Sequence, residues 1–230
     1  MLLAEAQITQ LSPSGARPGT RHARGVILAG IASFAALTAV VNTKHGKAMD
    51  RAITSRLQAN DDPRIERTMT LVAWFGYPPQ SRVLPTAYAA VLWIARLRRE
   101  AVFQLAASGT GLLSTIVKAF MRRPRPVAGK HLRVVAAPLG GSSFPSGHVL
   151  TYVGVYGWMA IMAGHLVRPP LLRRLVVGVL TTLVAAVGPS RVYLGHHWPS
   201  DVLASYLLGS SYLAALLLAY RRIKPRRVLP

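Results

Sequence analysis

A polar segment, Ser190–Asp201 (SRVYLGHHWPSD), lies between two strongly apolar stretches and contains groups able to do chemistry. His197 precedes Asp201 by four residues, close enough for the carboxylate to accept a hydrogen bond from one ring nitrogen. That bond would select one tautomer of the imidazole and leave the other nitrogen free to attack an electrophile. Pro199 suits the first turn of a helix, where Asp201 has the simpler alternative role of a favourable helix-start carboxylate. We interpret His196 as an interfacial side chain.

A second polar segment, SSFPSGHVL, places Ser146, Gly147 and His148 at the expected start of an apolar helix. Glycine lets the backbone approach a ligand closely, and the free N–H groups at a helix start bind anions. Histidine titrates near neutrality, so His148 beside such an anion is a candidate proton donor. The alternative is an ordinary helix start with an exposed histidine.

A third segment, KAFMRRPRP, carries Lys118 and Arg125, and with Arg191 it provides three cations that could hold a tetrahedral anion. Each has a simpler reading. Lys118 would be favoured at a helix C-terminus by the helix dipole, and Arg191 could snorkel to the membrane interface. Arg122 and Arg123, like Arg125, could bind anionic lipid headgroups.

Taken together, these segments supply three cations, a helix start, two histidines and one carboxylate. That set suits metal-independent phosphoryl transfer, in which positioning and charge neutralisation dominate. Of the seven Asp and Glu residues, only Asp201 lies beyond residue 100, so the C-terminal half alone cannot build two-carboxylate hydrolysis or a carboxylate cage for magnesium. The chain has no cysteine, which excludes a thiolate nucleophile and a thiolate metal site.

The elements that must position these groups are long apolar runs. The chain has 230 residues, is 51% hydrophobic and has a formal net charge of +21. A soluble nucleic-acid-binding protein could be as basic. The runs free of Lys, Arg, Asp and Glu argue against that class of protein; they are Gly25–Thr43, Ala101–Val117, Val149–Val167, Leu175–Ser190 and Val202–Tyr220. A weaker candidate is Pro79–Ala95, which contains Arg82. Runs of this length in lipid must be helical, so we predict an all-α, six-transmembrane-helix bundle.

We divide the chain into a flexible tail (1–24), one six-span domain (25–220) and a basic C-terminal tail (221–230). Gly25–Thr43 could be a signal-peptide core, but it is long and has no clear small-x-small cleavage site, so we interpret it as an uncleaved span. Residues 44–67 have mixed charge and predict an amphipathic helix lying at the membrane surface.

Charge gives the expected orientation. If the N-terminus, the short basic turns 96–100 and 168–174 and the C-terminus are cytoplasmic, each side of the membrane carries 14 Lys and Arg. Half of the opposite set belongs to the long first loop, which counts less in the positive-inside rule, so this orientation is favoured. We therefore expect loops 118–148 and 189–201 to face the periplasm or cell exterior from a plasma or inner membrane.

Three stretches of the sequence resemble the signature motifs of the type 2 phosphatidic acid phosphatase superfamily. They are Lys118, six residues, Arg125 and Pro126; then PSGH at 145–148; then Ser190 and Arg191, five residues, His197, three residues and Asp201. That superfamily also includes lipid phosphate phosphatases, undecaprenyl pyrophosphate phosphatases and vanadium haloperoxidases. The motifs cover 118–201, and the six-span layout extends the resemblance over about 25–220.

The resemblance implies a role for each motif residue. His197 would be the nucleophile and form a phosphohistidine, Asp201 would orient it, and His148 would protonate the leaving oxygen and then activate water. The implied phosphate-binding residues are Lys118, Arg125, Ser146, Gly147 and Arg191. The resemblance implies no metal and no other cofactor, with membrane lipids rather than nucleic acid as partners.

Several alternatives stay open on the residues alone. They are phosphoryl transfer between lipids, vanadate-dependent haloperoxidase chemistry, and a basic membrane protein that binds anionic lipid without turnover. The phosphate-binding set does not identify the attached group, so phosphatidic acid, phosphatidylglycerophosphate, undecaprenyl pyrophosphate and lipid A phosphates are all candidate substrates. Lys130, His131 and Arg133 are candidates for contacting the headgroup.

Overall fold

The computed structural model describes residues 18–129, 132–135 and 140–223 and contains helices and turns without a strand in those ranges. The helices are α1 (Pro18–Val40), α2 (Lys44–Leu57), α3 (Pro63–Trp74), α4 (Gln80–Ile94), α5 (Arg98–Ala107), α6 (Gly109–Phe120), α7 (Gly147–Thr151), the π-helical turn η1 (Tyr152–Tyr156), α8 (Gly157–Leu166), α9 (Pro170–Tyr193) and α10 (Pro199–Ile223). The prediction of an all-α polytopic membrane protein is confirmed.

The predicted number of six spans is not confirmed. Within the described ranges, five helical stretches are long and apolar enough to cross a membrane: Ala23–Val40, Arg98–Phe120, Gly147–Leu166, Pro170–Tyr193 and Pro199–Ile223. The sixth candidate corresponds to α4, which has 15 residues and contains Pro85. A straight helix of that length covers only about 22 Å, less than the ~30 Å of the hydrocarbon core.

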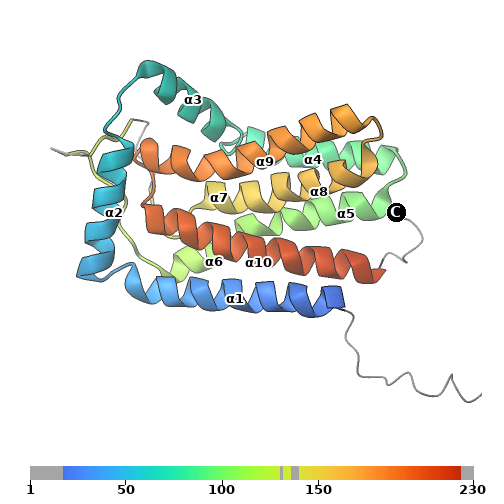
Figure 1. Ribbon diagram of the computed structural model, residues 1–230, viewed down its shortest axis with the longest axis horizontal. Helices are drawn as coiled ribbons and strands as arrows, with labels where there is room; N and C mark the ends of the chain where they lie inside the picture. Colours follow the sequence, from blue (N-terminus) through green and yellow to red (C-terminus); the bar gives the residue numbers. More distant parts are fainter. Residues whose placement is uncertain (1–17, 130–131, 136–139, 224–230) are drawn as a thin grey trace, which may run out of the picture.

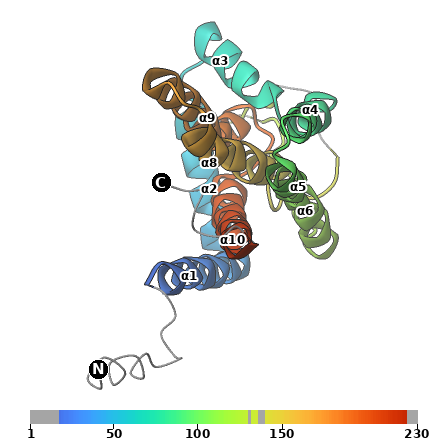
Figure 2. The same cartoon turned by 90° about the vertical axis from the view of Figure 1, so that its right-hand side faces the viewer.

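The helices pack side by side, with α1 along α10 at one edge of the bundle (Figures 1 and 2). Ser211 Oγ of α10 lies 3.4 Å from the Ile27 carbonyl oxygen of α1. This packing supports the interpretation of the first apolar run as an uncleaved span. Because α1 begins at Pro18, residues 18–24 of the predicted tail are helical, and the tails 1–17 and 224–230 lie outside the described residues.

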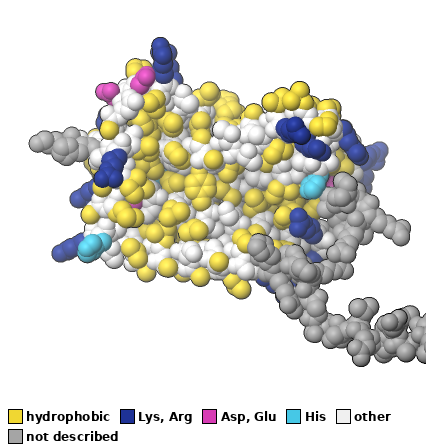
Figure 3. All heavy atoms as spheres, in the orientation of Figure 1, with side chains coloured by type: hydrophobic (Ala, Val, Ile, Leu, Met, Phe, Trp, Pro, Cys, Tyr) yellow, Lys and Arg dark blue, Asp and Glu magenta, His cyan; other side chains and the backbone are white. Residues whose placement is uncertain are grey.

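The connections sort to two ends of the bundle. The start of α1, the α4–α5 and α8–α9 turns and the end of α10 lie at one end, and α2, the α6–α7 loop and the α9–α10 loop lie at the other (Figure 1). On the face in Figure 3, hydrophobic side chains fill the middle and Lys and Arg side chains gather at both ends, as expected for a membrane-spanning body.

The segment predicted as one surface helix, 44–67, differs from the prediction. It forms α2 and the first part of α3, with a break between them, and α2 crosses the end of the bundle (Figure 1). One face of α2 is buried: Asp50 and Thr54 have 1% and 0% of their surface exposed. α2 therefore contributes to the interior rather than lying only on the membrane surface.

Two tyrosines of η1 hold the end of α3 against the bundle. Tyr152 donates its hydroxyl hydrogen bond to the carbonyl of Val72, and Tyr156 donates to the carbonyl of Phe75 at 3.1 Å. π-Helical turns often occur at functional sites. Here the turn fixes the chain immediately before Gly76 and Tyr77, which contact the candidate site.

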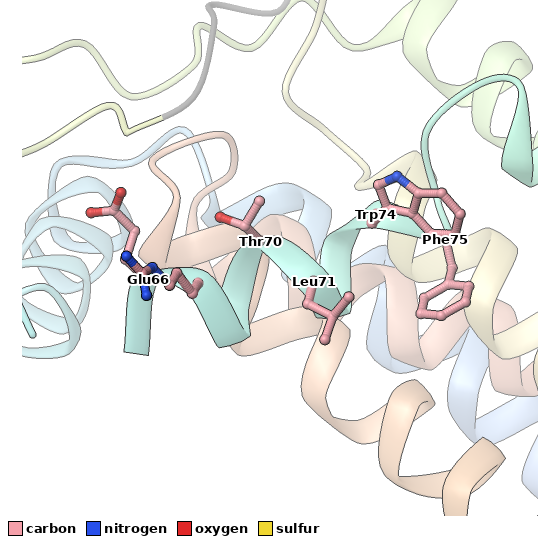
Figure 4. Close-up of a pocket in the computed structure, with 6 residues that line it drawn as sticks. Glu66, Thr70, Leu71, Trp74 and Phe75 are labelled. Atoms are coloured by element: carbon pink, nitrogen blue, oxygen red, sulfur yellow. The ribbon is translucent and has the colours of Figure 1, made fainter. Parts of the chain in front are cut away.

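Figure 4 shows an open hollow of about 450 Å³ along α3, lined by Glu66, Arg67, Thr70, Leu71, Trp74 and Phe75. No residue predicted to bind phosphate or to react lines it. Leu71 and Trp74 are 63% and 45% exposed, as suits side chains that face lipid.

Candidate active site

His197 lies in the α9–α10 loop, where the backbone turns sharply at Gly195. Gly195 has φ +73°, and a Cβ at that position would lie 2.2 Å from the Arg133 carbonyl oxygen, so the turn requires glycine. His197 is 2% exposed. Its Nδ1 lies 2.7 Å from the Ser143 carbonyl oxygen, and since a carbonyl only accepts, Nδ1 carries the proton. Nε2 then carries the ring's lone pair, which accepts a hydrogen bond from Arg125 Nη1 at 3.2 Å.

The expected partner of His197 is not its direct hydrogen-bond acceptor. Asp201 Oδ2 is 3.7 Å from Nδ1, too far for a hydrogen bond. The Asp201 carboxylate is already used, because Oδ2 accepts from the Trp198 N–H at 2.8 Å and Oδ1 pairs with Arg123. Asp201 therefore acts on His197 through charge and through the backbone that carries it, while the Ser143 carbonyl selects the tautomer.

Burial lowers the pKa of His197 to about 4, although the nearby Asp201 carboxylate acts in the opposite direction. The imidazole is therefore neutral at pH 7, the form that can act as a nucleophile. Burial also lowers the pKa of Arg125, as does the positive charge of Arg191. A guanidinium nonetheless stays charged at neutral pH.

Lys118 and Arg125 converge on one carbonyl. Lys118 Nζ at the end of α6 donates to the Ser142 carbonyl oxygen at 3.0 Å, and Arg125 Nη2 donates to the same atom at 3.2 Å. Arg125 Nη1 also donates to the His196 carbonyl at 2.8 Å. The two cations thus lie next to each other, and Arg125 also lies next to His197, as the proposed phosphate contact requires.

Arg191 is fully buried near the end of α9 and meets two aromatic side chains. Its Nη1 lies 2.7 Å from the Tyr77 hydroxyl, and its Nη2 contacts His196 Nδ1. The interpretation of His196 as an interfacial side chain is wrong, because His196 is only 2% exposed and packs against Arg191. Neither Tyr77 nor the His196 contact could be read from the sequence.

Pro189, two residues before Arg191, lies inside α9. Pro189 has no N–H to give to the carbonyl four residues earlier, Ala185. The Tyr206 hydroxyl of α10 lies 2.9 Å from that carbonyl oxygen and accepts from the Gly188 N–H at 3.0 Å. Tyr206 therefore binds α9 backbone groups close to Pro189, just before Arg191.

His148 lies at the start of α7 against Gly76 and Tyr77. Its ring packs edge to face with Tyr77 at a centroid distance of 4.6 Å. A Cβ at Gly76 would lie 2.4 Å from His148 Cδ2, so only glycine leaves room for the imidazole. His148 is within electrostatic range of Arg191, His197 and Lys118, which brings the three motifs to one end of the bundle.

The start of α7 contains buried polar atoms without hydrogen-bond partners among the described residues. Ser146 is fully buried, its N–H donates to Ser205 Oγ at 2.7 Å, and its own hydroxyl does not cap the helix. Within the described part of the chain, Ser146 Oγ and His148 Nε2 have no hydrogen-bond partner. A Cβ at Gly147 would lie 3.2 Å from Ser114 Oγ, so the chain is tightly packed there. Buried polar atoms without a partner are atoms that a bound ligand could satisfy.

Arg123 and Asp50 are functional candidates that sequence reasoning missed. Arg123 was expected to bind lipid headgroups, but that interpretation is wrong: it is 3% exposed and pairs with Asp50 and Asp201. The only available signal was that Asp50 is the sole acid in a basic helix, and this does not identify a partner 73 residues away.

Of the three residues predicted to contact the headgroup, Lys130, His131 and Arg133, the structure describes only Arg133. Arg133 is used within the fold, because its backbone N–H donates to Gln58 Oε1 at 2.9 Å and its guanidinium donates to the Gln58 carbonyl at 3.2 Å. Lys130 and His131 lie outside the described residues. A cavity of about 250 Å³ beside the site is lined by Arg125, Pro126, Val127, Ala128, Val134, Gly195 and His196.

Residues 99–225, more than half of the chain, match the family model of the PAP2 superfamily. The chain belongs to the PAP2 superfamily. This PAP2 chain is 29% identical over 181 residues to phosphatidylglycerophosphatase B of Bacillus subtilis (strain 168), covering 76% of the chain and 85% of that protein. The resemblance inferred from the motifs is thus confirmed.

Solved structures agree with the family assignment. The crystal structure of a transmembrane PAP2-type phosphatidylglycerolphosphate phosphatase from Bacillus subtilis matches with a TM-score of 0.78 and 26% identity, over 87% of this chain and 98% of that one. Aquifex aeolicus LpxE shares the fold, with a TM-score of 0.56 and 21% identity over 73% and 93% of the two chains. This member of the PAP2 superfamily is a multi-pass membrane protein and a phosphatase.

Proposed function

We propose that the protein removes phosphate from a lipid phosphate at the membrane surface through a phosphohistidine on His197. The observation that carries the proposal is the geometry around His197, whose Nδ1 donates to the Ser143 carbonyl and whose unprotonated Nε2 accepts from Arg125. When substrate binds, Arg125 would donate to the phosphate instead and release the Nε2 lone pair for attack. A neutral imidazole aimed into a group of cations is suited to attack a phosphate dianion.

In the first step, the Nε2 lone pair of His197 forms a bond to phosphorus while the bond from phosphorus to the lipid oxygen breaks. His148, whose protonated form the dianionic phosphate would stabilise, gives a proton to the leaving oxygen. In the second step, His148 takes a proton from water, the water oxygen bonds to phosphorus, and the phosphorus–nitrogen bond breaks. The products are the dephosphorylated lipid and inorganic phosphate.

The phosphate oxygens would be held by Lys118, Arg125 and Arg191, with the Ser146 hydroxyl and the Gly147 N–H at the start of α7. The unpaired Ser146 Oγ supports this assignment. Three cations supply the charge neutralisation that a divalent metal provides in many other phosphoryl-transfer sites, so we propose metal-independent turnover.

Phosphatidylglycerophosphate is the substrate that we propose first, because the matching Bacillus subtilis sequence and the matching Bacillus subtilis crystal structure are both named for it. The mainly apolar cavity beside Arg125 would take part of the organic group attached to the phosphate.

The test is a phosphate-release panel on purified protein in detergent with phosphatidylglycerophosphate, phosphatidic acid, undecaprenyl pyrophosphate and a lipid A phosphate. We expect release from at least one lipid, fastest from phosphatidylglycerophosphate, and equal rates with EDTA or magnesium. Loss of activity in EDTA that magnesium restores would disprove the metal-free mechanism. Dephosphorylation without free phosphate, or bromide oxidation with vanadate, would indicate lipid-to-lipid transfer or haloperoxidase chemistry instead.

We also propose that the site faces the periplasm or cell exterior of a plasma or inner membrane. Two cations at the site's end have structural uses, since Arg123 is in a buried ion pair and Arg133 binds Gln58. This leaves the short basic turns at the opposite end as the stronger cytoplasmic signal.

The chain has no cysteine, so single engineered cysteines report orientation cleanly. In intact cells or spheroplasts, a membrane-impermeant maleimide should label Ala128→Cys at the site's end and spare Ala95→Cys at the other end. Both positions are exposed in the structure. The reverse labelling pattern would place the site in the cytoplasm.

A further inference from the structure

We infer that Asp50 and Arg123 position His197 for reaction, so that α2, outside the three motifs, is part of the working site. The inference rests on the proposed function, in which His197 is the nucleophile. Neither residue touches the expected phosphate position, so both are positioning residues.

Arg123 connects to both groups that face His197 Nδ1. Its backbone carbonyl accepts from the Ser143 N–H at 2.9 Å, and the carbonyl of Ser143 in turn accepts from Nδ1. Its guanidinium Nη1 pairs with Asp201 Oδ1. A shift of Arg123 would therefore move the tautomer-selecting carbonyl and the neighbouring carboxylate together.

Asp50 fixes the guanidinium of Arg123 from the other side. Asp50 Oδ2 lies 2.5 Å from Arg123 Nη2, which also donates to the Val41 carbonyl at 3.0 Å in the α1–α2 turn. The planar guanidinium presents its donors in a rigid fork, so these contacts allow one orientation toward Asp201.

Asp50 also holds the start of α10. The Ser200 N–H donates to Asp50 Oδ1 at 2.9 Å, and the Ser200 hydroxyl donates to Oδ2 at 2.7 Å. The carboxylate thus satisfies an orphan donor in the first turn of the helix. Because Ser200 lies three residues after His197, this bond ties the loop that carries His197 to α2.

Because its charges are buried, the Asp50–Arg123–Asp201 cluster is sensitive to substitution of any of the three residues. Asp50, Arg123 and Asp201 are 1%, 3% and 0% exposed, so two carboxylates share one guanidinium away from water. Removing Arg123 leaves two buried carboxylates without their partner, which is costly. Removing the Asp50 charge leaves the Arg123–Asp201 pair but takes away the contact that orients the guanidinium from the other side. The Asp50→Asn variant is neutral and keeps the shape of the side chain and one oxygen that can accept from Ser200. Toward Arg123 it presents either an amide N–H₂, which cannot accept, or an amide oxygen, which accepts more weakly than a carboxylate.

The test compares kcat and KM per folded molecule for wild type, Asp50→Asn and Arg123→Met, with lipid phosphate as substrate. We expect Asp50→Asn to lower kcat about tenfold with KM within about twofold, because displacement of a reacting group costs rate more than binding. The matched control is Asp61→Asn, an exposed acid between α2 and α3, which should match wild type.

A second variant distinguishes positioning from a merely structural role. Arg123→Met leaves two buried carboxylates facing each other, and adding Asp50→Asn removes one of those charges. We expect the double variant to have a kcat above that of Arg123→Met alone. If Arg123→Met does not fold, Asp50→Asn alone decides the question.

The outcomes separate this inference from the proposed function. If Asp50→Asn retains wild-type kcat while His197→Ala is inactive, the inference fails and the proposed function stands. If His197→Ala is active, the proposed function fails, whatever Asp50→Asn does. A loss in Asp50→Asn that follows only the folded fraction, with kcat per folded molecule unchanged, would also overturn the inference.

Discussion

Replacing His197 by alanine is expected to lower phosphate release by about 10⁴-fold while leaving a folded, membrane-inserted protein. The physical reason is that His197 supplies the attacking lone pair. Its Nδ1 is held protonated by the Ser143 carbonyl, which leaves Nε2 unprotonated at 3.2 Å from the Arg125 guanidinium. The measurement is the initial rate of phosphate release from a lipid phosphate in detergent.

The covalent intermediate gives this prediction a second readout. Wild-type protein quenched during turnover with radiolabelled substrate should retain acid-labile, base-stable phosphate, and His197→Ala should retain none. His165→Ala is a suitable control, because His165 is exposed at the end of α8 remote from the site. Activity of His197→Ala within about tenfold of wild type would rule out its role as nucleophile.

Replacing His148 by alanine should lower lipid phosphate hydrolysis by about 10²- to 10⁴-fold, the usual contribution of a general acid and base. The size of the loss should depend on the leaving group. A lipid alkoxide needs a proton as it departs, whereas p-nitrophenolate does not. With p-nitrophenyl phosphate, His148→Ala should therefore retain the phosphorylation step and be limited by hydrolysis of the phosphohistidine.

Rapid mixing of His148→Ala with p-nitrophenyl phosphate should show a burst of nitrophenolate followed by slow turnover. Asp61→Asn serves as the exposed control for handling of the protein. An equal loss on both substrates, with no burst, would mean that His148 only maintains packing against Tyr77 and Gly76, since that contact is independent of the leaving group.

The spacing argument for His197 and Asp201 illustrates how far local reasoning reaches. Four residues at the start of a helix do bring the two side chains near each other, at 3.7 Å. The acceptor of the Nδ1–H hydrogen bond depends on competition among donors, because the Asp201 carboxylate also accepts from the Trp198 N–H and pairs with the Arg123 guanidinium. That competition involves residues far apart in the chain, so the sequence could not decide it.

Burial explains the two wrong interpretations. His196 and Arg123 were expected at the membrane interface because polar side chains beside apolar runs usually face headgroups or water. In the folded chain Arg191 and Tyr77 cover His196, and Asp50 and Asp201 enclose Arg123. Polar residues become buried where partners converge, and the convergence is a property of the fold.

By itself, the sequence determined the helical membrane-spanning class and the residue types of the three motifs. Those follow from local rules: apolar runs in lipid must satisfy their own backbone hydrogen bonds, and short motifs keep their spacing in any fold. Only the tertiary structure decided that Ser143 holds His197 and that Asp50 on α2 reaches Arg123 and Ser200. These depend on which distant segments meet at the end of the bundle, and helix packing settles that across the whole chain at once.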